Sequence, residues 1–562
     1  MADPFCPRWP NVQQVISAAR VDHQPIVVHF ARRLGLVEMI NRLVTTEMEV
    51  EPGVIALGLV LDTLNGRSPL YHLEKTFEEC DRALLFGREL PAEYFSDDNV
   101  GRMLDVFYKT GTQRLFSELS VAALQRFPIA TRLVHFDTTS VNLFGEYRVI
   151  EGEEPPFNIT HGYSKDKRPD LKQFVFSLLC VDGNVPILGR IEDGNASDKT
   201  LNHGILGEVA RHMRTHGVEE GAFIYVADSA MVTEANLEQA GERILFVTRL
   251  PATYNEHEDV ILRAIEADDW TEVGKIAQTP STEHRPGASY RVSEGSVTLY
   301  GKRYRAAVVH SSAHDKRRLK RLERELRASR SEAEKIAKSW RKKVFFCLPD
   351  AEAAAAEVQS TTYHQVEVSI EKRPRYPRGR PKDNVLRVPV AIDYVFRTEI
   401  VEKRKEIDKR RQLAGCFVLL SNLPEDGYNA EQILRTYKEQ HAIEKNFGFL
   451  KDDQIVNALF LERPERIEAL GLILLISLLI WRLMELVMRT ELQAREATVP
   501  GWDDKSTARP SAYMMTWKFK GILVLCIDGQ RMLSKPLTET QEAFLLALEV
   551  PVSCFTQHPR DG

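Results

Sequence analysis

The sequence predicts an α/β protein in which helices precede a mixed core and a β-rich insertion interrupts that core. Up to about residue 130, apolar residues recur at a spacing near 3.6, which is typical of helices. From residue 131 the spacing changes to that of short strands alternating with helices. This pattern stops after Leu250 and resumes near Gly415, so a long insertion divides the core.

The first 130 residues are expected to form a helical N-terminal domain. Apolar periodicity marks four helices, at residues 36–44, 53–64, 99–111 and 112–127. Gly66, Pro69 and Pro91 separate them. Such a domain could bind DNA ends or mediate dimerisation, and a plain packing domain would show the same pattern.

The core is expected at residues 131–250 and 413–490, followed by a C-terminal region at 491–562. The expected strands and helices follow one another in chain order. They are strands at 131–139, 140–147, 172–183 and 185–194, a helix at 199–217, a strand at 223–228, a helix at 233–241 and a strand at 243–250. Antiparallel strands followed by alternating helices and strands are the order of an RNase H-like fold.

The insertion, residues 251–412, combines β-like segments with one long charged helix at about 314–343. The start of this helix is rich in cations that could contact a DNA backbone, although charged helices are usually solvated faces. These cations are Lys316, Arg317, Arg318, Lys320 and Arg321. Further on, Arg378-Gly379-Arg380 resembles an AT-hook core, which binds the minor groove, and it equally suits a plain linker.

Composition excludes several classes of protein. With 43% hydrophobic residues among 562, the chain can bury a core, and a net charge of −5 argues against nonspecific nucleic-acid binding by the whole molecule. The seven cysteines form no CxxC pair, which indicates neither zinc nor disulfides and favours a reducing cytoplasm. The longest apolar run, 469–481, is shorter than the roughly 20 residues of a membrane span, so a buried helix and no membrane contact are expected.

Three carboxylates stand out against this background. Asp137 and Asp228 each end a short strand-like run, and Glu444 lies on a predicted helix. Two strand-end Asp residues and a helical Glu can together hold two Mg²⁺ ions for phosphodiester chemistry. Taken singly, each Asp is explained as well by a turn or a helix cap.

A helix starting near Asn429 carries the third carboxylate. Tyr437, Gln440, Glu444 and Lys451 follow one another at i, i+3, i+7 and i+14, so they share one face of a continuous helix. A packing helix would present apolar side chains there. This polar face suits a metal-ligating carboxylate flanked by donors to phosphate.

The box Y-x2-Q-x3-E-x6-K resembles the Y-R-E-K signature of bacterial insertion-sequence DDE transposases. The segments HFDTTSVNLFGEY and YVADSAMVTEANL resemble those around the first and second Asp of that family. The likeness spans most of the chain and is weakest in the insertion. Gln440 stands where the family has Arg, which replaces a charged, forked phosphate contact by a neutral amide.

The resemblance implies a role for each residue of the box. Asp137, Asp228 and Glu444 would coordinate two Mg²⁺ ions, with Mn²⁺ as a substitute. Tyr437, Gln440 and Lys451 would contact DNA near the scissile phosphate.

The resemblance also implies an activity and its partners. The chain would cut double-stranded DNA at the terminal inverted repeats of an insertion sequence, through a hairpin or another route, and join the ends to target DNA. A homodimer in a synaptic complex and a place at the bacterial nucleoid in the cytoplasm would follow. Two alternatives stay open: a DNA-binding protein that has lost catalysis or been domesticated, and an RNase H-like nuclease without strand transfer.

Overall fold

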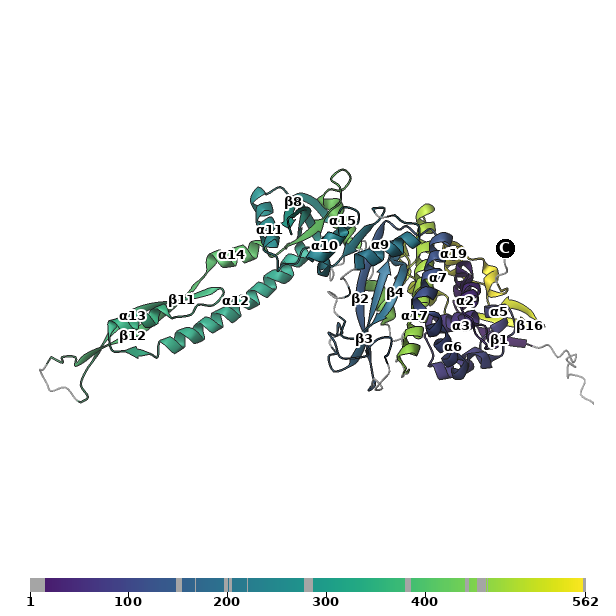
Figure 1. Ribbon diagram of the computed structural model, residues 1–562, viewed down its shortest axis with the longest axis horizontal. Helices are drawn as coiled ribbons and strands as arrows, with labels where there is room; N and C mark the ends of the chain where they lie inside the picture. Colours follow the sequence, from purple (N-terminus) through teal and green to yellow (C-terminus); the bar gives the residue numbers. More distant parts are fainter. Residues whose placement is uncertain are drawn as a thin grey trace, which may run out of the picture. The chain divides into compact units, whose positions relative to one another are not determined.

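The computed structural model (Figure 1) describes residues 16–147, 154–166, 168–196, 201, 205–219, 221–276, 287–379, 386–439, 444–451, 461 and 463–558. The chain forms two compact units. The first unit combines the residues up to Thr248 with those from Thr436 onward, and the second unit runs from Arg249 to Arg435. The five-part domain division expected from the sequence stays a prediction.

Helices fill the N-terminal part of the first unit, as predicted, although the helices at 24–34, 73–78 and 82–86 were not expected. They are α1 (Gln24–Leu34), α2 (Leu36–Leu43), α3 (Pro52–Leu64), α4 (Leu73–Glu78), α5 (Arg82–Phe86), α6 (Asp97–Thr110) and α7 (Thr112–Arg126). Local signals place their ends. Pro52 occupies the first turn of α3, and Asp97 and Asp98 begin α6, where negative charge favours the helix dipole.

A mixed sheet forms the centre of the first unit. Five strands lie in the order β4 (Pro186–Glu192), β3 (Lys172–Cys180), β2 (Leu133–Leu143), β5 (Ile224–Ala227) and β6 (Leu245–Arg249). Strand β3 is antiparallel to β2 and β4, whereas β5 runs parallel to β2 and β6 runs parallel to β5. Helix α9 (Ile205–Thr215) lies between β4 and β5 in the chain, and α10 (Glu234–Ala240) lies between the parallel strands β5 and β6.

One prediction within this sheet was wrong. The segments 131–139 and 140–147 were expected as two strands, but the structure has a single strand, β2. The polar residues Thr138, Thr139 and Ser140 suggest a turn in the sequence. They are instead buried and pair continuously with β3, so the chain does not reverse there.

Helix α17 (Pro464–Ala494) packs against β4 together with α7 (Figure 1). Two glycines allow the close approach, since a Cβ at Gly189 of β4 would collide with Leu475, and one at Gly471 with Ile191. Among the described residues α17 is the one helix long and apolar enough to cross a membrane, and 94% of its most apolar stretch is buried inside the protein. This burial is what the sequence predicts for a core helix.

The C-terminal residues complete the first unit. They form α16 (Glu444–Leu450), β14 (Val499–Pro500), β15 (Ser506–Thr507), α18 (Ala512–Lys518), β16 (Leu523–Ile527), β17 (Gln530–Leu533) and α19 (Glu539–Leu548). Strand β1 (Ile16–Arg20) pairs antiparallel with β16, which pairs with β17, so the first and last strands of the described chain share a small sheet.

The second unit contains two sheets and a long helix. One sheet has the order β13 (Cys416–Ser421), β9 (Lys302–Ser311), β8 (Ser289–Leu299), β7 (Thr271–Lys275), with α11 (Asn255–Ala267) packed on β8. The other has the order β10 (Val344–Phe345), β12 (Ala391–Glu402), β11 (His364–Arg375). Helix α12 (Ser312–Trp340), close to its predicted range, packs on β11 and β12. The remaining helices are α13 (Leu348–Ala356), α14 (Arg404–Gln412) and α15 (Ala430–Glu439), which continues into the first unit.

Candidate functional site

Asp137 and Asp228 lie side by side on adjacent parallel strands. The register pairs His135 of β2 with Val226 of β5. Continuing this register by two residues places Asp137 opposite Asp228. The two carboxylates, 91 positions apart in the sequence, are therefore neighbours at the end of β5.

The two residues differ in their local structure. Asp228 directly follows β5, as predicted, and its Oδ1 accepts a hydrogen bond from the backbone N–H of Ala230 (2.9 Å). Asp137 was expected at a strand end but lies within β2, which continues to Leu143. Because β5 ends at Ala227, the side of β2 that faces it has no strand partner beyond this point in the part of the chain that the structure describes. The Asp137 side chain keeps 30% of its surface exposed.

Lys165 supplies a positive charge beside Asp137. Its Nζ lies 4.0 Å from Asp137 Oδ1 and donates to the carbonyl and hydroxyl oxygens of Thr138, at 2.7 and 2.9 Å. A bond from the Lys165 backbone N–H to Ser140 Oγ (3.1 Å) holds the segment against β2. In the sequence, residues 161–170 form a mixed-charge loop that could approach DNA or be solvated, and the contact of Lys165 with Asp137 was not predicted.

Lys451 also lies at the segment that contains Lys165, where it forms an ion pair. Its Nζ lies 2.7 and 2.8 Å from the two carboxylate oxygens of Asp166, the residue after Lys165. Asp166 also accepts from Asn142 of β2 (3.0 Å). The structure thus places Lys451 against the segment that holds Lys165, where Lys451 is paired with the carboxylate of Asp166.

Glu444 begins α16, and its side chain lies outside the described residues. Two positions later, Asn446 fixes the helix to the sheet. Its Nδ2 donates to Cys180 Sγ (3.1 Å) at the end of β3 and to the carbonyl of Asn184 (3.0 Å). Cys180 pairs with His135, two residues before Asp137, so the start of α16 is anchored near the two aspartates.

A buried ion pair continues this anchor into α17. Arg482 Nε donates to Asn446 Oδ1 (2.6 Å), and its Nη1 donates to Glu485 Oε2 (2.6 Å). The two charged side chains are only 5% and 3% exposed. Burial alone raises the pKa of Glu485, but Arg482 and Arg489 bring it below its ordinary value, so this carboxylate stays ionised. An Arg and a Glu three positions apart in an apolar run are the sequence signal that could have revealed this network.

Other residues of the predicted polar face are only partly placed. Tyr437 is half-buried in α15, and Gln440 lies outside the described residues. The single helix expected from Asn429 to Lys451 is described as two, α15 and α16, and Lys451 follows the end of α16. In α15, Glu439 Oε2 lies 3.4 Å from Nη2 of Arg132, the residue that directly precedes β2.

Two buried polar side chains lie close to the aspartates. Burial, and then Arg132, lowers the pKa of His135 to about 4, so this histidine is neutral near pH 7. Tyr225 of β5 is fully buried, and its hydroxyl has no hydrogen-bond partner among the described residues. Burial raises the pKa of Tyr225, and the charges of Asp228 and Asp137 raise it further, so both carboxylates act on the same buried point.

The chemistry of these donors fits a hard divalent cation. Asp137 and Asp228 offer carboxylate oxygens, which are the ligands that Mg²⁺ and Mn²⁺ prefer. Within the described residues no group of three or more His, Cys, Asp or Glu side chains is placed to hold a metal ion, and the side chain of Glu444 is not among them. The described cysteines are free thiols.

The predicted basic residues of the second unit begin α12. Lys316, Arg317, Lys320 and Arg321 are exposed, whereas Arg318 is half-buried. Burial, and then the nearby charges of Arg249, Arg410 and Arg321, lowers the pKa of Arg318. Several guanidinium groups therefore gather here, which favours binding of an anion. Arg378 is exposed beyond β11, and Arg380 lies outside the described residues.

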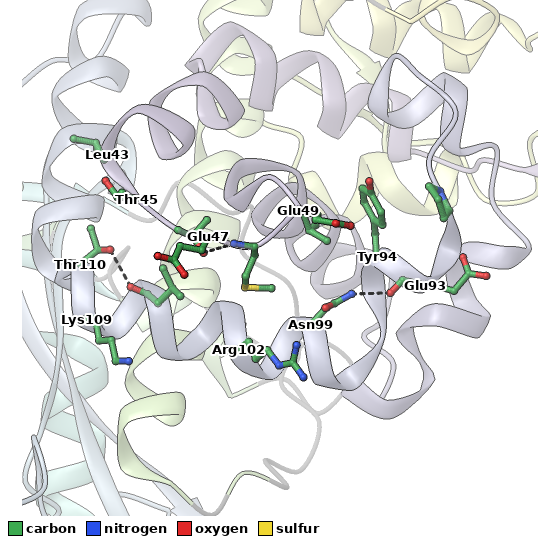
Figure 2. A pocket seen from close by; sticks show the side chains of 15 residues that line it. Leu43, Thr45, Glu47, Glu49, Glu93, Tyr94, Asn99, Arg102, Lys109 and Thr110 are labelled. Carbon is green, nitrogen blue, oxygen red and sulfur yellow. Dashed lines mark hydrogen bonds between the residues drawn. The ribbon is translucent and has the colours of Figure 1, made fainter.

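A separate pocket of about 1250 Å³ lies in the N-terminal helical region (Figure 2). The extended segment after α2 carries Glu47 and Glu49 and faces Arg102 and Lys109 of α6. Asn99 closes one end by donating to the carbonyl of Glu93 (3.0 Å). The lining mixes both signs of charge, which indicates no single class of ligand.

Comparison with known proteins identifies one region. Residues 16–121 match a family described as a domain of unknown function (DUF4277). The match covers α1 to α6 and most of α7, with the pocket between them. No curated protein sequence matches the chain.

Proposed function

We propose that this chain is a DDE transposase with an RNase H-like core, which cuts DNA at the ends of an insertion sequence and transfers the ends to target DNA. The observation that carries the proposal is the juxtaposition of Asp137 and Asp228 at the end of β5, beside the anchored start of the Glu444 helix. The strand order β4-β3-β2-β5-β6, with its parallel second half, supports an RNase H-like core.

Each residue of the candidate site has a role in this proposal. Asp137, Asp228 and Glu444 would hold two divalent ions. Bound ions of this kind supply Lewis-acid chemistry, which activates a water or 3′-hydroxyl nucleophile and stabilises the leaving oxygen. Lys165 offsets the negative charge of Asp137. Lys451 and Tyr437 would contact the DNA backbone, and Lys451 must leave Asp166 to do so.

The second unit would hold the DNA outside the cleavage centre. The exposed cations that begin α12 suit phosphate contacts, and Arg378 suits a groove contact. The partners proposed are double-stranded DNA with terminal repeats, target DNA and a second copy of this chain in a synaptic complex. The proposed location is the nucleoid of a bacterial cytoplasm.

The test is metal-dependent cleavage of labelled DNA that carries the flanks of the chain's own gene. Wild type should nick at the repeat boundary with Mg²⁺ or Mn²⁺, and Asp137→Asn, Asp228→Asn and Glu444→Gln should each lose at least about 100-fold in rate because a ligand is lost. The matched control is Asp170→Asn, an exposed Asp that pairs with Arg168. A joined product separates a transposase from a nuclease, and specific binding without cleavage would favour the DNA-binding alternative.

A further inference from the structure

Three aromatic side chains gather on the surface of the first unit, far along the chain from the three carboxylates. Trp502, Tyr513 and Trp517 are 43%, 47% and 54% exposed. The ring of Trp502 lies 6.1 Å from that of Tyr513 and 6.3 Å from that of Trp517, measured between centroids. We call these three residues the aromatic platform.

The backbone segments that carry the platform are held by hydrogen bonds and by buried side chains. Trp502 lies in the turn between β14 and β15, where the Lys505 N–H bonds the Trp502 carbonyl (3.1 Å). Tyr513 and Trp517 lie on α18, whose first turn is capped by Ser511. The opposite side of α18 is buried through Met514 and Met515. The three rings are therefore exposed on an ordered surface, because the turn that carries Trp502 and the helix that carries Tyr513 and Trp517 are both held by backbone contacts.

One cation lies beside a ring of the platform, and further cations neighbour the platform in the sequence. Lys520 Nζ lies 5.2 Å from the centroid of Trp517, and Lys505 and Arg509 are exposed. Residues 501–520 contain four Lys or Arg against two Asp, whereas the whole chain has a net charge of −5. Exposed rings flanked by cations are the combination that binds unpaired nucleic-acid bases, because rings stack on bases while cations meet the phosphates. A two-fold contact with a second copy would instead bring these cations against one another.

Hydrogen bonds join the platform to the Glu444 helix. Glu485 Oε1 accepts from the backbone N–H of Ala512, the first residue of α18 (3.0 Å). The same carboxylate pairs with Arg482, which bonds Asn446 of α16. Arg489 adds a bond to the carbonyl of Pro510 (3.0 Å). One buried network thus fixes both the helix that begins with Glu444 and the helix that carries two rings of the platform.

We propose that the aromatic platform binds an unpaired stretch of a DNA strand by stacking its bases on Trp502, Tyr513 and Trp517, with Lys505, Arg509 and Lys520 at the phosphates. This inference rests on the proposed function, because a centre that breaks DNA strands creates ends whose bases can separate. In an intact duplex the base faces are covered by their neighbours, so the rings select unpaired DNA.

The experiment uses the full chain and a labelled oligothymidylate of about 15 nucleotides, with a random duplex of equal length as competitor. Binding is read from the anisotropy of the label and from quenching of tryptophan fluorescence. Trp502→Ala and Trp517→Ala should each weaken oligothymidylate binding about 10-fold. Duplex binding should stay as in wild type, and Trp517→Phe should restore most of the affinity. The matched control, Tyr71→Ala, removes an exposed ring elsewhere in the first unit and should change nothing.

Salt dependence separates the rings from the cations. Lys520→Gln should lower the slope of log affinity against log salt by about 0.7, whereas the Trp variants should keep the wild-type slope. Wild-type oligothymidylate binding by the Trp502→Ala/Trp517→Ala double variant would overturn the proposal. So would an equal loss of duplex and single-strand binding, or a change confined to the dimer fraction measured by light scattering.

The inference and the proposed function can fail separately. Asp137→Asn/Asp228→Asn should lose cleavage and keep oligothymidylate binding. If wild type cuts no DNA while the Trp variants still lose single-strand affinity, the transposase proposal fails and the platform stands. If cleavage occurs and the Trp variants bind normally, only the platform fails.

Discussion

Among the described ion pairs, the most buried one lies in the first unit, whereas those along α12 of the second unit lie at the surface. In the first unit, Arg482 and Glu485 form a buried ion pair, and Arg482 also bonds the side chain of Asn446, two positions after Glu444. In the second unit, α12 carries ion pairs on its exposed surface, such as Arg321 with Glu325 and Arg330 with Glu334. Buried ion pairs hold the surrounding side chains in one geometry. Solvated charges are free to change conformation and can adapt to the phosphates of a DNA backbone. The difference matches the proposed division between a cleavage centre and a DNA-contacting unit.

Acidification should distinguish the units most strongly. Burial is the main cause that lowers the pKa to about 4 at His23, His135 and His212 in the first unit, and at His257 in the second. Such a histidine binds fewer protons in the folded than in the unfolded chain between pH 6.5 and 4. Each therefore removes stability as the pH falls through this window, by up to about 3 kcal/mol. The first unit should open at the higher pH, as measured by hydrogen exchange of its peptides.

Buried carboxyls of the first unit oppose this trend, because burial also raises the pKa of Asp182, Glu192 and Glu439, and Asp62 shows the largest effect. Burial raises the pKa of Asp62 in α3 to about 6, so its contribution to stability grows as the pH falls from 6 toward 3.8 and offsets roughly one histidine. As a control, His23→Gln should flatten the acid response of the first unit and leave that of the second unchanged. Earlier opening of the second unit would contradict the prediction.

Breaking one buried and one exposed pair should sharpen the comparison. Arg482→Met leaves Glu485 buried beside only Arg489 and should lower the free energy of unfolding by roughly 3–5 kcal/mol. Arg435→Met breaks the exposed pair with Glu431 and should cost only about 0.3–0.5 kcal/mol. Urea unfolding followed by circular dichroism measures both values. Equal effects would show that the buried network contributes no more than a surface pair.

A smaller effect is expected at the Lys451–Asp166 pair. Asp166→Asn removes the carboxylate that engages Lys451, so this lysine becomes available to phosphate. Duplex affinity should rise by up to about 5-fold, since partly exposed pairs contribute up to about 1 kcal/mol. Anisotropy of a labelled duplex measures the change, with Asp170→Asn as the control. Unchanged or weaker binding would mean that Lys451 serves the fold and does not contact DNA.

Periodicity predicted the elements that depend on local pattern. The N-terminal helices, α12 and the buried α17 have simple repeats of apolar or charged residues, and the structure confirms them. Both aspartates were expected at strand ends, but only Asp228 directly follows its strand, because β2 continues past Asp137 to Leu143.

Long-range contacts were beyond the sequence. The single strand β2 depends on Thr138 to Ser140 being buried against β3, which no local signal shows. The contact of Lys165 with Thr138 depends on how a loop folds back. The network around Arg482 joins residues from three distant segments, and the aromatic platform joins two. The spacing of Arg482 and Glu485 in an apolar run indicates a buried pair in the sequence, but the partners of this pair become visible only once the chain is folded.

The split of the first unit around the second has a consequence for the order of events during synthesis. Residues 249–435 are contiguous, so they can fold on the ribosome as soon as they emerge. The first unit must wait for α16 and α17, and β1 must wait until β16 leaves the exit tunnel. A nascent chain can therefore present its cationic α12 helix before Glu444 exists. Under the proposed function, such an unfinished chain would carry its DNA-contacting cations before its cleavage centre is complete.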